Sequence, residues 1–176
     1  MYNQPETWFR LMDKLTDMSI QYLRAQVESG ASLIQIFDSW GGALSREDYA
    51  YYLSPSMNRI INSVREMDTP VIVFGIGASH LIPEWNTLDM DVIGLDWRTS
   101  IDQARELGVK KALQGNLDPA LLLADWQVIE DRTKAILDQG RNEAHIFNLG
   151  HGVFPEVDPA TLKRLTSFVH EYSKGK

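Results

Sequence analysis

The sequence predicts an α/β protein in which about five parallel strands alternate with helices. Three observations lead to this fold class. Short runs of apolar and β-branched residues recur along the chain, helical patterns lie between them, and turn residues bound the runs. Because each helix returns the chain to the same edge of the sheet, alternation of this kind produces parallel strands with right-handed crossovers.

The predicted strands are predominantly apolar, as is typical of strands buried on both faces of a parallel sheet. They cover residues 33–37 (LIQIF), 71–75 (VIVFG), 91–96 (DVIGLD), 111–115 (KALQG) and 144–150 (AHIFNLG).

The first helix is predicted over residues 5–29, because Pro5 suits a helix start and Gly30 suits a helix end. Its apolar side chains approximate a stripe along one face. They are Trp8, Leu11, Leu15, Met18, Tyr22, Ala25 and Val27. A second helix is predicted from Ser45 towards Met67, since the acidic residues that follow Ser45 favour the positive end of the helix dipole.

Three shorter helices are expected over 79–88, 99–107 and 125–139, and a last one over 158–174. Asp158 is placed to cap the last helix, and Pro159 occupies its first position.

The loop sequences that follow the strands distinguish a doubly wound sheet from a barrel. A doubly wound dinucleotide-binding fold carries G-x-G-x-x-G after its first strand, whereas this chain has FDSWGGALS there, and GIGAS at 75–79 matches only half of that motif. A (β/α)8 barrel fits better. Complete barrels take about 250 residues, so 176 residues with about five strands fit only part of one, expected as a single domain over 1–176.

Composition excludes several classes of protein. The net charge of −7 disfavours nucleic-acid binding, which requires a basic surface. The absence of cysteine excludes disulfides and thiolate zinc sites. No apolar run approaches the roughly 20 residues of a membrane span, so we expect no membrane partner and a cytoplasmic location.

Small and polar residues follow all five predicted strands, where ligands bind in parallel α/β folds. Asp38 is interpreted as a helix cap or a partner for an arginine, and Ser39 either bonds a backbone group in a turn or faces a ligand. Asp96 is interpreted as holding its loop through backbone amides. Asn116 and Asp118 are assigned to the start of a helical turn at Pro119.

The stretch FNLGHGVFPEVDP places His151 between two glycines, which allow a ligand to approach the backbone closely. Histidine titrates near neutral pH and can donate or carry a proton. The other histidines are weaker candidates. His145 opens a strand at the end opposite the polar rim, His170 lies late in the last helix, and His80 follows a strand end and stays open.

Four stretches together resemble the uroporphyrinogen decarboxylase family. They are GASLIQIFDSWGGALSREDY (30–49), VIGLDWR (92–98), ALQGNLDPALLLA (112–124) and HIFNLGHGVFPEVDP (145–159), in the order and spacing of that family. The resemblance spans the chain from YNQPETWFRLMDKLTD to FVHEYS and corresponds to the carboxyl-terminal half of the family's sequence.

The resemblance implies a carboxyl-terminal portion of a (β/α)8 TIM barrel in a haem-pathway enzyme. Such enzymes remove four acetate carboxyl groups from uroporphyrinogen, as homodimers and without metal or organic cofactor. It assigns substrate contacts to Phe37, Ser39 and His151, and catalytic roles to Ser39 and His151. The family's arginine-rich segment, its pyrrole-binding aspartate and a tyrosine paired with the serine have no counterpart here. We therefore expect little activity from this chain alone, and either self-association or a complementary amino-terminal half.

Two alternatives remain open at this point. The chain is either one half of a split enzyme or a non-catalytic remnant that only folds and associates. A methyltransferase of the same superfamily, acting on corrinoid or thiol carriers, requires a cysteine-bound zinc ion, and this chain has no cysteine.

Overall fold

The computed structural model describes residues 1–141 and 143–174, which form two compact units, Met1–Ile93 and Gly94–Lys176. Their strands are β1 (Ile34–Phe37), β2 (Val71–Phe74), β3 (Val92–Gly94), β4 (Ala112–Gln114) and β5 (His145–Ile146). The order of the strands in the sheet is their order in the chain. A doubly wound sheet reverses its order at a switch point, and this one does not. The predicted α/β class with five parallel strands is confirmed.

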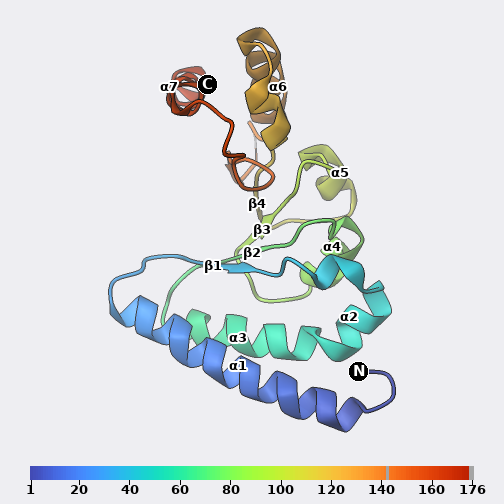
Figure 1. Cartoon of the computed structure of the whole chain (residues 1–176). Helices are drawn as coiled ribbons and strands as arrows, with labels where there is room; N and C mark the ends of the chain where they lie inside the picture. Colours follow the sequence, from blue (N-terminus) through green and yellow to red (C-terminus); the bar gives the residue numbers. More distant parts are fainter. Residues whose placement is uncertain (142, 175–176) are drawn as a thin grey trace. The chain divides into compact units, whose positions relative to one another are not determined.

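The first unit builds its core around β1 and β2, which pair in parallel from Ile34 opposite Val71 to Phe37 opposite Phe74. All four residues of β2 are buried, as its uninterrupted apolar sequence predicts. Helix α1 (Pro5–Glu28) packs on α3 (Ser54–Arg65), and the two run side by side in Figure 1. Two ion pairs join them, from Arg59 to Asp13 and Asp17, each at 2.7 Å.

The single helix predicted from Ser45 to Met67 is wrong, because the structure has two helices there. Ser45 caps α2 (Arg46–Tyr52) by accepting a hydrogen bond from the Asp48 amide at 3.1 Å, and α3 begins at Ser54. Pro55 explains the break, since proline has no N–H to continue the hydrogen bonds of the preceding helix.

Helix α1 carries the predicted apolar stripe, but four of the large side chains in that stripe are exposed to solvent. Leu11, Leu15, Met18 and Tyr22 are between 42% and 68% exposed. Thr16, on another face, is buried. Helix α1 therefore presents an apolar stripe that its own unit does not cover. The rest of the unit's helical segments are η1 (Gly41–Ala43), η2 (Ser79–Leu81) and α4 (Ile82–Trp85).

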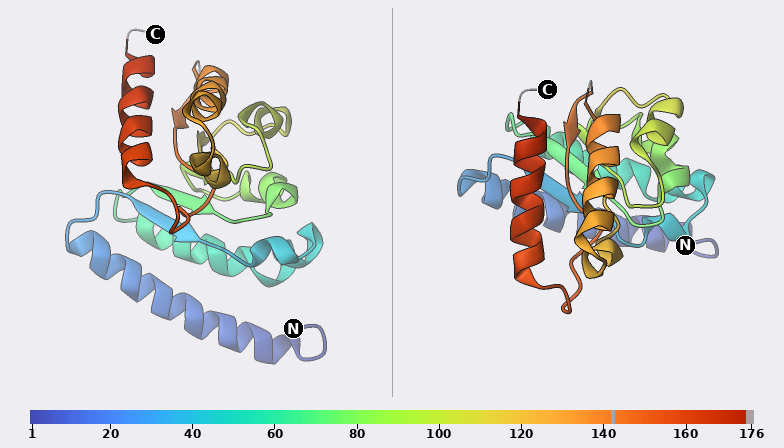
Figure 2. Two further views of the ribbon diagram at one scale, coloured as in Figure 1. Left: turned by 45° about the horizontal axis from the view of Figure 1, so that its top comes forward. Right: turned by 90° about the horizontal axis from the view of Figure 1, so that it is seen from above.

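The second unit contains α5 (Ile101–Glu106), η3 (Pro119–Leu123), α6 (Trp126–Gln139) and α7 (Pro159–Ser173). Helices α6 and α7 lie side by side in both views of Figure 2. They enclose a cluster of buried apolar side chains: Leu117, Leu122, Ile129, Val157 and Leu165. Asp158 caps α7 at the Ala160 amide, as predicted.

The last strand is shorter than the predicted 144–150. Pairing of β4 with β5 joins Leu113 to His145 and Gln114 to Ile146, and a single bridge from Leu117 to Leu149 follows. Between these contacts, Gly115 adopts φ +135°, a conformation open to glycine and not to strand residues. The regular pairing ends at that point.

Thr133 on α6 is fully buried, and its hydroxyl has no hydrogen-bond partner among the described residues. A buried unpaired hydroxyl costs stability. We expect Thr133→Val to raise the free energy of unfolding by about 1 kcal/mol, as measured by urea denaturation. Thr133→Ser is the matched control, because it keeps the hydroxyl and loses the methyl group. A Val variant less stable than the Ser variant would contradict this assignment.

Candidate functional site

In the first unit, Asp38 begins the loop after β1 and bonds both to the end of β2 and within its own loop. The Asp38 amide donates to the Phe74 carbonyl at 2.8 Å, and the Asp38 carboxylate accepts from the Gly41 amide at 2.9 Å. Asp38 thus bonds the first amide of η1, while the N-cap position itself is Trp40. The His80 ring nitrogen Nε2 lies 2.7 Å from the Leu44 carbonyl, which gives His80 a structural role.

Phe37 and Ser39 lie at the end of β1, on either side of Asp38. Phe37 is 66% exposed, and its ring meets that of Phe74 edge-on with centroids 6.0 Å apart. Ser39 is half-buried. An aromatic ring and a hydroxyl thus stand at the carboxyl end of a parallel strand, the position at which these folds bind ligands.

Behind this rim, Tyr49 and Trp85 are fully buried with ring centroids 6.3 Å apart. Burial, reinforced by the negative charge of Asp38, raises the pKa of the Tyr49 hydroxyl well above its usual value. Tyr49 therefore remains a neutral phenol that supports the loop and carries no charge at any physiological pH.

In the second unit, the loop after β3 is organised by Asp96. This buried carboxylate accepts from the Arg98 amide at 2.9 Å and from the Arg98 guanidinium at 2.8 Å. Asn116 is also buried, and its amide donates to the carbonyls of Asp96 and Thr99. Both residues hold loops, as the sequence suggested, and Asp118 caps η3 at the Ala120 amide.

His151 follows the Leu117–Leu149 bridge and is exposed. Its ring lies edge-on to the indole of Trp97, with centroids 6.3 Å apart and planes at 76°. The sequence pattern assigned the glycine before it to close approach by a ligand. In the structure, a Cβ atom at Gly150 would lie 2.5 Å from the Trp97 backbone nitrogen, so this glycine allows two loops of the protein to touch.

A pocket of about 390 Å³ opens beside the loops that follow β3 and β4. Its lining includes Trp97, Arg98, Asn116 and, from α6, Arg132. Of its two guanidinium groups, that of Arg98 is paired with Asp96, and the lining also includes the Asp118 carboxylate.

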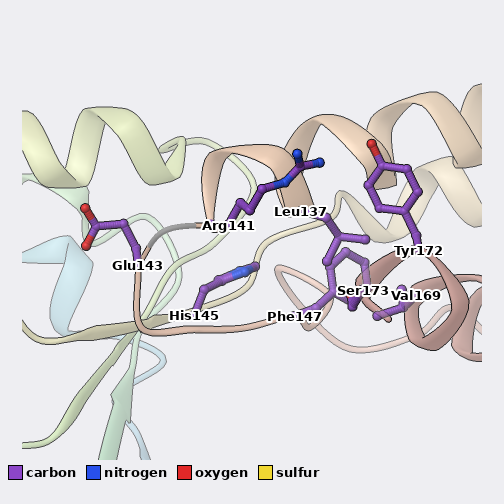
Figure 3. A pocket seen from close by; sticks show the side chains of 9 residues that line it. Leu137, Arg141, Glu143, His145, Phe147, Val169, Tyr172 and Ser173 are labelled. Atoms are coloured by element: carbon purple, nitrogen blue, oxygen red, sulfur yellow. The ribbon is translucent and has the colours of Figure 1, made fainter. Parts of the chain in front are cut away.

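A second pocket, of about 300 Å³, is lined by residues of β5, α6 and α7, including His145, Phe147 and Tyr172 (Figure 3). It contains none of the predicted site residues. Its polar groups bond to neighbours: the His145 ring nitrogen Nε2 lies 2.7 Å from the Gly115 carbonyl, and the Tyr172 hydroxyl donates to Asp138 at 3.1 Å. His145 opens β5, as predicted, while its ring reaches the Gly115 carbonyl just after β4.

Burial lowers the pKa of His145 below its ordinary 6.5, although the Gly115 carbonyl acts in the opposite direction. The unfolded chain therefore binds this proton more readily than the folded chain. We expect the free energy of unfolding to fall as the pH drops through 6.5, with the loss complete below the folded pKa. Thermal unfolding between pH 7.5 and 5.5 checks this. His145→Gln should reduce the dependence and His170→Gln should not; equal slopes in all three proteins would contradict it.

Within residues 1–141 and 143–174, the structure contains no group of three or more His, Asp or Glu side chains placed to hold a metal ion. In the same described part of the chain, no helix is both long enough and apolar enough to cross a membrane.

The structure places Phe37 and Ser39 in the first unit and His151 in the second, so a common cleft for the three stays a prediction. The contact partner of His151 was missed by sequence reasoning. In the sequence, Trp97 stands out only as a residue of the stretch VIGLDWR. The signal that points to it is the pair of short motifs LDWR and LGHG at the ends of two strands of one unit.

The family described as uroporphyrinogen decarboxylase (URO-D) matches residues 1–172. Curated relatives named uroporphyrinogen decarboxylase include one from Oceanobacillus iheyensis, 63% identical over 177 residues, which are 100% of this chain and 51% of the relative. One from Staphylococcus aureus is 64% identical over 99% of this chain and 51% of its own length. The chain thus spans about half the length of the curated relatives it matches.

A solved structure also resembles the chain, that of a Listeria monocytogenes protein assigned as a vitamin-B12 independent methionine synthase. The TM-score is 0.68, over 96% of this chain and 57% of that one, at 12% sequence identity. At that identity the likeness concerns the fold alone, and it agrees with a partial (β/α)8 barrel.

Proposed function

Because the chain belongs to the uroporphyrinogen decarboxylase family, we propose that it provides the carboxyl-terminal half of an enzyme that converts uroporphyrinogen to coproporphyrinogen. The observation that carries this proposal is identity of 60–64% to relatives of that name across essentially the whole chain. The alignment with the Oceanobacillus iheyensis relative is 177 residues long, and this chain has 176 residues. The alignment therefore contains no long gap that could hold a different site.

The reaction proposed is the replacement of an acetate carboxylate by a proton, four times per substrate. Protonation of a pyrrole ring carbon produces a cationic ring. The electron pair of the bond to the carboxylate then moves into that ring, and CO2 leaves an exocyclic methylene group. This methylene takes up a proton and becomes a methyl group, and the ring carbon loses the proton it gained at the start, which restores the neutral pyrrole. The ring itself is the electron sink, so the protein needs only to place proton carriers and to bind carboxylates.

We assign the proton-carrying and orienting roles to His151 and Ser39, and contact with the face of the macrocycle to Phe37. Support comes from their positions. Phe37 is the last residue of β1, Ser39 follows that strand, and His151 follows the Leu117–Leu149 bridge. The carboxyl ends of parallel strands are where barrels of this kind bind their ligands. The exposed ring of Phe37 is available for stacking on a flat ligand.

The second part of the proposal concerns the partner, which we infer to be an amino-terminal half with the remaining βα units. In a barrel, each helix packs against helices of adjacent units, and the stripe of Leu11, Leu15, Met18 and Tyr22 on α1 is open for such a contact. Strand edges without a neighbour also favour pairing. A second copy of this chain is the competing occupant.

Reconstitution tests both parts. The purified 176-residue chain is assayed with uroporphyrinogen alone, and then with the segment of the Oceanobacillus iheyensis relative that this chain does not cover. We expect turnover only in the mixture, together with a one-to-one complex in light scattering. Turnover by the chain alone would overturn the need for a partner. A one-to-one complex without turnover would overturn the decarboxylase assignment and favour a non-catalytic remnant.

A further inference from the structure

In the second unit, the loop that contains Gly150 and His151 touches the loop that contains Trp97. The Gly150 amide donates to the Leu117 carbonyl at 2.7 Å, which continues the Leu117–Leu149 bridge. A Cβ atom at position 150 would lie 2.5 Å from the backbone nitrogen of Trp97 and 3.1 Å from its Cβ. Only glycine fits this approach, because the atoms it would meet include backbone that cannot turn away.

The approach brings the Trp97 indole to the imidazole. Their rings are 6.3 Å apart between centroids and inclined at 76°, the edge-to-face arrangement that aromatic rings prefer. Contact with a half-buried indole restricts the orientations open to an otherwise exposed imidazole.

The Trp97 indole is held in place by Arg98. The guanidinium of Arg98 lies over its ring, 4.1 Å from the centroid, a cation–π contact. Arg98 is anchored in turn by the buried carboxylate of Asp96, through both its amide and its guanidinium. A continuous set of contacts thus runs from a buried charge to the surface imidazole.

We propose that Trp97 is a positioning residue for His151, and that Gly150 is required because it allows the two loops to touch. This inference rests on the proposed function, in which His151 carries a proton. It adds that the imidazole is oriented before substrate binds, which lowers the entropic cost of reaching a reactive geometry.

The contact is tested by NMR of the histidine ring signals in the 176-residue chain, with the His151 signals identified by their loss in His151→Gln. We expect these signals to lie away from the positions of an exposed histidine, because of the indole ring current. Trp97→Leu should return them to those positions, and Trp97→Phe should keep part of the shift. Trp40→Leu is the matched control, since Trp40 is 84% exposed.

The two glycines beside His151 give a second matched pair. Gly150→Ala should move the His151 signals, whereas Gly152→Ala should not, because a Cβ atom at Gly152 meets nothing within 4 Å. The signals of the other three histidines report whether each variant is folded. His151 signals unmoved by Trp97→Leu, or moved equally by the two glycine variants, would overturn the proposal.

Turnover in the reconstituted enzyme then separates positioning from packing. Trp97→Leu should lower kcat at least tenfold with little change in KM, and Trp97→Phe should recover most of the loss. Unchanged kcat in Trp97→Leu would overturn the positioning role. A wild-type assembly without turnover would overturn the proposed function, while the NMR signals still decide whether Trp97 orients His151.

Discussion

Replacing His151 with glutamine is expected to lower kcat for uroporphyrinogen by a factor on the order of 100 to 10,000, the range found when a positioned acid or base is removed. Glutamine retains a hydrogen-bond donor and an acceptor but cannot carry a proton. If the imidazole only bound a carboxylate, KM would rise and kcat would be retained. The measurement is steady-state kinetics of the reconstituted pair of segments.

His170→Gln is the matched control for this experiment. His170 is exposed near the end of α7 and belongs to no predicted site, so its replacement should leave both constants within about twofold. A His151 variant with full kcat would remove His151 from the proton-transfer steps and leave Ser39 as the remaining assigned group.

The largest effect on stability is expected at Asn116. Its buried amide donates to two carbonyls of the β3–α5 loop, those of Asp96 and Thr99. Asn116→Ala leaves both carbonyls without this donor inside the unit, and each unpaired buried group costs about 1–3 kcal/mol. We expect a loss of about 2–4 kcal/mol in the free energy of unfolding, measured by urea denaturation.

Asn62→Ala is the comparison, because Asn62 lies on the exposed side of α3 and its replacement should change stability by less than about 0.5 kcal/mol. An equal effect of the two substitutions would show that Asn116 does not hold the loop. Asn116→Asp should be worse than Asn116→Ala, since a carboxylate would face two carbonyl oxygens.

The element order and most helix boundaries could be predicted from the sequence because local chemistry determines them. Pro5, Asp158 and Ser45 mark helix starts through capping and through the conformation of proline. The single helix expected over 45–67 and the long last strand were wrong for local reasons: the chain breaks before Pro55, and the positive φ of Gly115 ends the pairing of β4 with β5.

Other features depend on contacts between distant residues, which periodicity does not reveal. The pattern of α1 shows that an apolar stripe exists but not whether anything covers it, and four of its side chains are exposed. Likewise, a glycine before a histidine indicates that some group lies close to the backbone there, but the sequence does not identify that group. The answer at Gly150 is the backbone of Trp97, more than 50 residues earlier in the chain.

The most direct test of the central claim, that Ser39 and His151 share one cleft, uses a paramagnetic label. The chain has no cysteine, so Ser39→Cys provides a single attachment point. In NMR of the labelled chain, alone and with the complementary segment, the label should broaden the signals of His80, which follows the neighbouring strand, and those of His151. The signals of His145, which opens β5 six residues before His151, should be broadened less. Sharp His151 signals beside broadened His80 signals would contradict the claim.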